Sequence, residues 1–191
     1  MNHFTYNDLE QLLITDKGYE PLRAKRAVYQ TKIFLRSLIY SLLIAFILFW
    51  FHCLKEAVIA IIVLKLYRRY SGGIHVKSYL LCFFGSLLLV GAIIVITKAL
   101  PLTIELEVIL GLINLFLWYQ YVPQGTDARP IRKTELKKKM KLHFLIAMVL
   151  SFSIRFLWME VYSICLFSMF FILLLTTPMA YKIFKVQHDR I

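Results

Sequence analysis

The chain has little of what a soluble domain, a disulfide scaffold or a disordered segment needs. Only 18% of its 191 residues are charged and 60% are hydrophobic, against roughly 45–50% apolar residues in soluble globular domains. Seven glycines and five prolines are too few for a disordered or collagen-like chain. A domain of this size could not bury so much apolar surface away from water. The composition, with a mean hydropathy of +0.68, therefore predicts an integral membrane protein.

Acidic residues and cysteines are also scarce. The 11 acidic residues face 23 basic ones, which gives a formal net charge of +12. Such an excess is common in nucleic-acid-binding proteins, but here the basic residues lie between apolar runs, as they do beside membrane spans. We therefore expect no nucleic-acid partner. The three cysteines are too few and too scattered for a disulfide framework or a zinc site, and we expect no metal and no organic cofactor.

Uncharged runs recur along the chain, most of them near the 20 or so residues needed to cross the hydrocarbon core. They predict an all-α, polytopic membrane protein with about six transmembrane helices. The second run has only eight uncharged residues, so it is either a short crossing with snorkelling flanks or a re-entrant segment. The six runs are 37–54, 57–64, 78–97, 108–126, 142–159 and 161–181, of which 142–159 is broken by Arg155 near one end.

The distribution of basic residues favours six crossings. With the N-terminus in the cytoplasm, six crossings leave only three of the 23 basic residues on the outer side, namely Lys55, Lys98 and Arg155. This is a strong positive-inside bias. A re-entrant second segment would put Arg68 and Arg69 outside. We therefore predict a multi-pass protein of the cell membrane, in contact with its lipids, with both termini in the cytoplasm.

The segment before the first run is not a crossing. Its apolar residues Phe4, Leu9, Leu12 and Leu13 form a stripe that predicts an amphipathic helix on the inner leaflet. The alternative is a helix that packs against the membrane bundle.

The segment 68–82, RRYSGGIHVKSYLLC, carries the clearest chemical pattern. A thiol nucleophile needs a base, and imidazole suits that role near neutral pH. In an unbroken helix His75 and Cys82 would be about 10 Å apart along the axis, too far for a hydrogen bond. Gly72 and Gly73 permit a tight turn that folds His75 back. The alternative is a buried, inert Cys82 and a solvated His75.

This segment resembles the signature of the accessory gene regulator B family, the integral membrane cysteine endopeptidases of Gram-positive quorum sensing. The later segment 122–131, VPQGTDARPI, is similar to the family's second motif. The resemblance covers most of the chain. It implies an enzyme that cuts the C-terminal tail from a propeptide and assists its cyclisation to a thiolactone or lactone. It further implies Cys82 as nucleophile, His75 as base, Arg68 and Gly73 as supporting residues, and a homodimer.

The group that would orient His75 is not evident. No acid or amide lies between Arg68 and Cys82. Asp127 in the second motif is the first candidate, with Asn114 and Gln120 as alternatives. The other cysteines, Cys53 and Cys165, are predicted to be structural.

Within the connection between the fourth and fifth runs, residues 129–141 are strongly basic, with seven positive charges and one acid. This segment can contact anionic lipids, and it can capture the acidic C-terminal tail that the resemblance implies for the propeptide. Both roles are compatible. The candidate substrate-binding residues are Arg129, Arg132, Lys133, Lys137, Lys138 and Lys139.

The alternative function is non-enzymatic, a small transporter or a peptide- or lipid-binding adaptor. Transporters place polar groups within several spans, whereas these runs offer little beyond scattered Ser, Thr and Asn114. The predicted organisation is a cytoplasmic amphipathic segment (1–36), a membrane domain (37–181) with an active-site segment (68–82) and a basic cytoplasmic loop (121–141), and a cytoplasmic tail (182–191).

Overall fold

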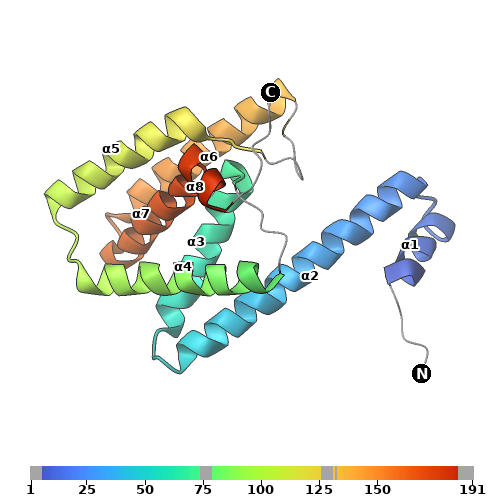
Figure 1. Cartoon of the computed structure of the whole chain (residues 1–191), viewed down its shortest axis with the longest axis horizontal. Helices are drawn as coiled ribbons and strands as arrows, with labels where there is room; N and C mark the ends of the chain where they lie inside the picture. Colours follow the sequence, from blue (N-terminus) through green and yellow to red (C-terminus); the bar gives the residue numbers. More distant parts are fainter. Residues whose placement is uncertain (1–5, 74–78, 126–130, 132, 185–191) are drawn as a thin grey trace. The chain divides into compact units, whose positions relative to one another are not determined.

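The computed structural model describes residues 6–73, 79–125, 131 and 133–184, and this part of the chain is all-α, as predicted. Its helices alternate with short connections (Figure 1). They are α1 (Tyr6–Thr15), α2 (Pro21–Phe49), α3 (Leu54–Ser71), α4 (Tyr79–Ala99), α5 (Ile104–Tyr121), α6 (Thr134–Ile154), α7 (Met159–Leu174) and α8 (Pro178–Ile183).

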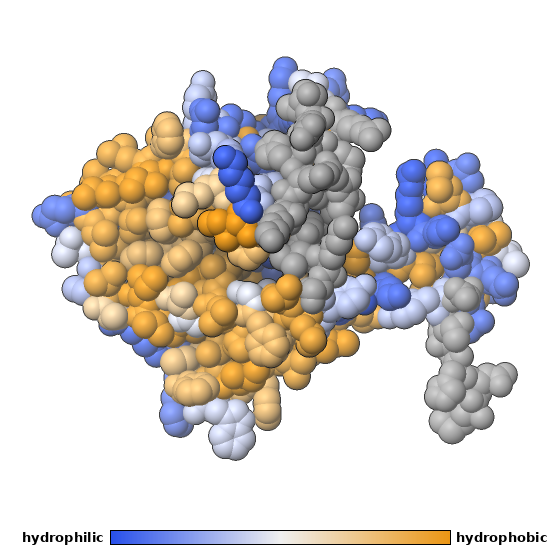
Figure 2. All heavy atoms as spheres, in the orientation of Figure 1, coloured by the Kyte–Doolittle hydropathy of each residue, from blue (hydrophilic) through white to orange (hydrophobic). Residues whose placement is uncertain are grey.

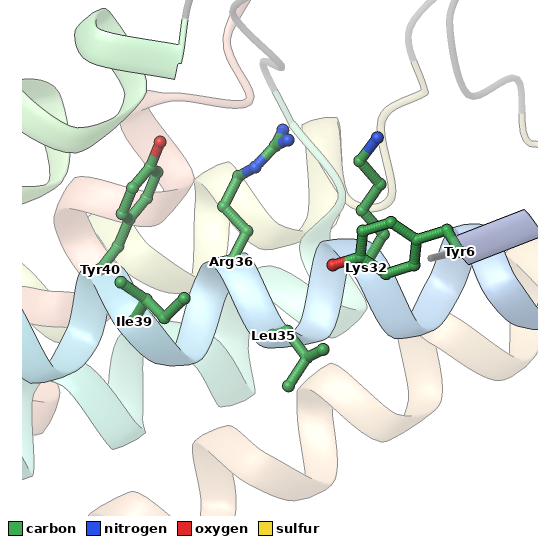
Figure 3. A pocket seen from close by; sticks show the side chains of 6 residues that line it. All are labelled: Tyr6, Lys32, Leu35, Arg36, Ile39 and Tyr40. Atoms are coloured by element: carbon green, nitrogen blue, oxygen red, sulfur yellow. The ribbon is translucent and has the colours of Figure 1, made fainter. Parts of the chain in front are cut away.

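The chain divides into two compact units, residues 1–44 and 45–191. In the first unit, the Lys32 ammonium lies 5.3 Å from the centre of the Tyr6 ring. Figure 3 shows Lys32, Arg36 and Tyr40 projecting from one side of α2, where they line a pocket of about 350 Å³ with Tyr6, Leu35 and Ile39. None of the predicted catalytic or substrate-binding residues lines this pocket. The position of α1 on the inner leaflet stays a prediction.

Helix α7 is the centre of the second unit. It contacts α3, α4, α5 and α6 (Figure 1), and apolar residues lie all round it, as expected of a helix that is enclosed by its neighbours. Its buried residues are Tyr162, Ile164, Cys165, Leu166, Phe167, Ser168, Met169, Ile172 and Leu173.

Three of the described helices, α2, α4 and α5, are long and apolar enough to cross a membrane, and α7 is a shorter apolar helix of 16 residues. Apolar side chains cover much of the face of the second unit seen in Figure 2. Leu88 of α4 and Leu112 of α5 are among the exposed ones. Such a surface suits hydrocarbon better than water. The chain therefore has the character of a multi-pass membrane protein, and the crossing by six helices stays a prediction.

Charged residues extend several helices beyond the uncharged runs. α2 begins at Pro21, not near residue 37, and α6 begins at Thr134, not near residue 142. The short run 57–64 lies inside the continuous helix α3, without a re-entrant turn.

The last predicted crossing, 161–181, is interrupted between α7 and α8. Pro178 cannot continue a helix because it has no backbone N–H, but it suits a first helical turn. Thr177 precedes it as the N-cap of α8, and its hydroxyl accepts a hydrogen bond from the Ala180 amide at 3.4 Å.

The three basic residues predicted on the outer side all form ion pairs at one end of the second unit. The pairs are Lys55–Glu160 at 2.9 Å, Lys98–Glu56 at 2.7 Å and Arg155–Glu107 at 2.6 Å. They join the start of α3 to the start of α7 and to the end of α4, and they join the start of α5 to the end of α6. The five helices therefore alternate in direction, and the end of α3, the end of α5 and the α7–α8 turn lie at the opposite end of this unit.

Candidate active site

At that opposite end, the two sequence motifs are joined by backbone hydrogen bonds. The Gln124 amide donates to the Ser71 carbonyl at 2.9 Å, and the Gly73 amide donates to the Gln124 carbonyl at 3.0 Å. These bonds form an isolated parallel bridge between Gly72 and Gln124. Residues 71–73 and 124, which we call the motif junction, thus unite the segment that leads toward His75 with the segment that leads toward Asp127.

The glycines of the junction are required by its geometry. Gly72 has φ +74°, and a Cβ added there would lie 2.0 Å from the Gln124 carbonyl oxygen. Gly73 has φ +101°, and its Cβ would lie 3.7 Å from the Leu175 oxygen and from Thr176 Cγ2. Positive φ values are strained for residues with a side chain. Only at Gly72 would an added side chain also collide with the backbone of Gln124.

A third segment, the turn between α7 and α8, supports the junction. Thr176 is buried there, and its hydroxyl donates to the Leu173 carbonyl at 2.6 Å. From α8, the Tyr181 hydroxyl donates to the Gly125 carbonyl at 3.2 Å. The site is therefore built from three parts of the chain that are far apart in sequence.

Cys82 lies in the first turns of α4, three residues beyond Tyr79. Its thiol is free and half-buried. Its backbone carbonyl accepts a hydrogen bond from the Ser86 hydroxyl at 2.8 Å. The side chain at the predicted nucleophile position is thus unbridged and partly accessible.

The remaining predicted site residues are only partly within the described chain. Arg68 is half-buried in the last turn of α3. His75, Asp127, Arg129 and Arg132 lie outside the described residues.

Of the two alternatives to Asp127, neither lies at the motif junction. Asn114 is buried within α5, seven residues before its end, and its Nδ2 donates to the Leu166 carbonyl of α7 at 3.3 Å. Seven residues correspond to about 10 Å along the helix axis. Gln120 is exposed near the end of α5.

The segment 121–141 is not a loop throughout, because α6 begins at Thr134. Lys133 is the N-cap residue of α6, and Lys137, Lys138 and Lys139 occupy its first two turns. Successive helical residues point about 100° apart, so these three lysines surround the helix and do not form one face. Lys138 and Lys139 are exposed and Lys137 is half-buried.

Several residues that were not predicted as site residues hold this end of the unit together. The Lys141 ammonium donates to the Tyr119 carbonyl at 2.7 Å, and Trp118 Nε1 donates to the Lys141 carbonyl at 3.2 Å. Tyr70 stacks on His143 of α6, with ring centres 5.3 Å apart. These contacts connect α6 to α5 and α3. The sequence signal that could have indicated these contacts is the presence of aromatic residues at the ends of α3 and α5 and of basic residues in the first part of α6.

The two other cysteines lie away from the motif junction. Cys53 is at the opposite end of the unit, where the Lys98 ammonium donates to its sulfur at 3.3 Å. Cys165 is buried in α7. Among the described residues, no group of three or more His, Cys, Asp or Glu side chains could hold a metal ion.

The chain matches known proteins over most of its length. The family model for Accessory gene regulator B matches residues 8–180, a range that includes both motifs. Protein FsrB of Enterococcus faecalis is 26% identical over 165 residues, which cover 84% of this chain and 67% of that protein.

Proteins of Clostridium perfringens are also similar. Putative AgrB-like protein 2 is 25% identical over 160 residues, covering 80% of this chain and 72% of that protein. Putative AgrB-like protein 1 is 34% identical over 101 residues, covering 53% of this chain and 52% of that protein. No solved structure matches the chain significantly.

Proposed function

The chain belongs to the accessory gene regulator B family, and from this premise we propose that it is a membrane cysteine endopeptidase that processes a quorum-sensing propeptide. Family membership itself implies processing of a quorum-sensing peptide. The proposal adds the chemistry: cleavage before the C-terminal tail of the propeptide, followed by assisted cyclisation to a thiolactone or lactone.

One observation carries the proposal, the direct hydrogen bonding between the two motifs. Ser71 and Gly73 of the first motif pair with Gln124 of the second. Cys82 is the last residue of the first motif and lies near the start of α4, with a free, half-buried thiol. Catalysis requires reacting groups held in fixed relative positions, and the two hydrogen bonds bring the backbones of the two motifs together.

The proposed reaction is acyl transfer in two steps. His75 takes the proton from the Cys82 thiol, and the thiolate attacks the carbonyl carbon before the propeptide's tail. The carbon–nitrogen bond breaks, His75 returns the proton to the departing amine, and an acyl thioester remains on Cys82. In the second step, an internal thiol or hydroxyl of the propeptide gives its proton to His75 and attacks the thioester carbonyl. The carbon–sulfur bond to Cys82 breaks, the ring closes, and the proton returns to the Cys82 sulfur. Asp127 is proposed to orient His75, and Arg68, Gly72 and Gly73 are proposed to support the site.

The proposed substrate is a short propeptide with an acidic C-terminal tail. The basic residues Arg129, Arg132, Lys133, Lys137, Lys138 and Lys139 are proposed to attract this tail. Lys138 and Lys139 are exposed at the start of α6, at the same end of the unit as the motif junction. The positive charges of these lysines would attract the negative charges of the tail and so steer it toward the site.

Alanine replacement tests the proposed nucleophile and base. Cys82→Ala and His75→Ala, each reconstituted in vesicles with a candidate propeptide, should lose cleavage by at least about 10³-fold, because nucleophile and base act as a unit. The measurement is release of the tail by mass spectrometry, with membrane insertion checked in parallel.

Cys53→Ala and Cys165→Ala are the matched controls, since they remove a thiol elsewhere in the same chain. Cleavage should persist in both. A well-inserted Cys82→Ala protein that still cleaves the propeptide would refute the thiol mechanism.

A further inference from the structure

Tyr181 connects the C-terminal helix to the motif junction. It lies on α8, is only 3% exposed, and donates its hydroxyl to the Gly125 carbonyl at 3.2 Å. Gly125 is itself buried and directly follows Gln124, the residue that pairs with Ser71 and Gly73. The Tyr181 hydroxyl thus binds the residue next to Gln124, whose backbone joins the two motifs.

The surroundings of Tyr181 hold it in place. Leu175 packs against Ala180 and Tyr181. Thr177 and Pro178 fix the start of α8. In the same turn, the Leu175 carbonyl oxygen and Thr176 Cγ2 lie 3.7 Å from the position that a Cβ would take on Gly73. The α7–α8 turn therefore lies beside Gly73 of the first motif, and α8 contacts Gly125 of the second.

We propose that Tyr181 is a positioning residue of the active site, which acts through the Gly125 carbonyl. Its hydroxyl holds Gly125 in place directly after Gln124, the residue that pairs with Ser71 and Gly73, and so steadies the hydrogen-bonded junction between the two motifs. This inference rests on the proposed function. Tyr181 itself takes no part in the bond changes.

The physical argument is the cost of a missing donor at this place. Without the hydroxyl, a carbonyl in a buried segment loses a hydrogen-bond donor, and the local backbone shifts to compensate. A displacement of about 1 Å between reacting groups can reduce a rate about a hundredfold. Loss of this hydroxyl should therefore reduce turnover more than it reduces stability or substrate affinity.

Tyr181→Phe and Tyr162→Phe form a matched pair that separates positioning from stability. Tyr162 is 1% exposed and donates its hydroxyl to Glu107 at 2.9 Å, at the opposite end of the same unit. Both variants lose one buried phenolic hydroxyl and keep the ring. We expect kcat to fall about tenfold to a hundredfold in Tyr181→Phe, with KM within about twofold of the wild type. In Tyr162→Phe, kcat should stay within about twofold.

A second measurement does not depend on the propeptide. In a background with Cys53→Ala and Cys165→Ala, the rate of Cys82 alkylation by iodoacetamide is followed against pH. A thiol held beside an imidazole reacts with a different pH profile from an isolated one. The Tyr181→Phe profile should move toward that of His75→Ala, and the Tyr162→Phe profile should match the parent.

The outcomes are distinct. Wild-type kcat and pH profile in Tyr181→Phe, or an equal loss of kcat in Tyr162→Phe, would overturn the positioning role. Failure of Tyr181→Phe alone to accumulate in membranes would overturn it too, by making the hydroxyl a folding determinant. p-Aminophenylalanine at position 181 keeps a donor and should restore kcat. If the wild-type chain cleaves no propeptide but the pH profiles differ as expected, the proposed function fails and the positioning role stands.

Discussion

Gly72 and Gly73 are adjacent at the end of α3 but meet different surroundings. Both have positive φ values, which cost any other residue strain. Only Gly72 faces the Gln124 carbonyl, at 2.0 Å from an added Cβ, whereas the Cβ position of Gly73 has ordinary contact distances of 3.7 Å. The two positions therefore differ in steric demand and not in backbone strain.

From this difference we predict that Gly72→Ala is much more harmful than Gly73→Ala. The Gly72→Ala side chain would break the hydrogen bonds between the motifs, and propeptide cleavage should fall at least about a hundredfold. Gly73→Ala should cost only the strain of its positive φ, about 1–2 kcal/mol of stability. Cleavage assays and thermal denaturation of both variants check this.

Gly91→Ala in α4 is the matched control, because nothing lies within 4 Å of its added Cβ. It should keep full activity and gain about 0.5–1 kcal/mol, since Ala is the better helix former. Equal activities of Gly72→Ala and Gly91→Ala would contradict the junction's role.

Among the helices, the start of α6 combines dense positive charge with exposure. Replacing Lys137, Lys138 and Lys139 together by Gln should raise KM for the propeptide several-fold and flatten its dependence on salt. Attraction between exposed charges is screened over about 8–10 Å at 0.10–0.15 M salt. Initial rates at several ionic strengths provide the measurement.

A triple replacement of Arg23, Lys25 and Arg26 by Gln at the start of α2 removes the same charge elsewhere, and we expect it to leave KM unchanged. If KM of the α6 variant equals that of the wild type at every salt concentration, the lysines serve only lipid contact and topology.

For the whole molecule, the alternating directions of α3 to α7 predict which residues face which side of the membrane. A single cysteine introduced at Lys138, in a cysteine-free variant, should react with an impermeant maleimide only after the membrane is opened. One introduced at Glu160, which pairs with Lys55 at the opposite end of the unit, should react in intact cells. The reverse pattern would refute the predicted orientation.

The all-α fold was predictable because uncharged runs are long and separated by basic segments. The helix ends were not, since a membrane helix can continue into charged residues, as α2 does before residue 37 and α6 does at Lys137 to Lys139. The break before α8 had a sequence signal, because Thr177 followed by Pro178 is typical of a helix start. The run 161–181 was defined only by its lack of charged residues, and this signal was therefore not used.

The candidate site was predictable to the level of its two motifs but not of their contact. Gly72 and Gly73 indicated a turn before Cys82, and the junction requires both glycines. Pairing of Ser71 and Gly73 with Gln124 is a contact between residues about 50 positions apart, which no local pattern specifies. The same holds for Tyr181, whose partner Gly125 lies 56 residues away.

The enclosure of α7 by four neighbouring helices has a consequence for biosynthesis. A chain is made from its N-terminus, and its parts fold in that order. Helices α3 to α6 therefore leave the ribosome before the helix that fills the space between them. The support that Tyr181 gives to Gly125 arrives later still. Newly made protein should thus reach full activity only after translation has passed α8, and a premature stop codon before Tyr181 should lower activity at least as much as Tyr181→Phe does.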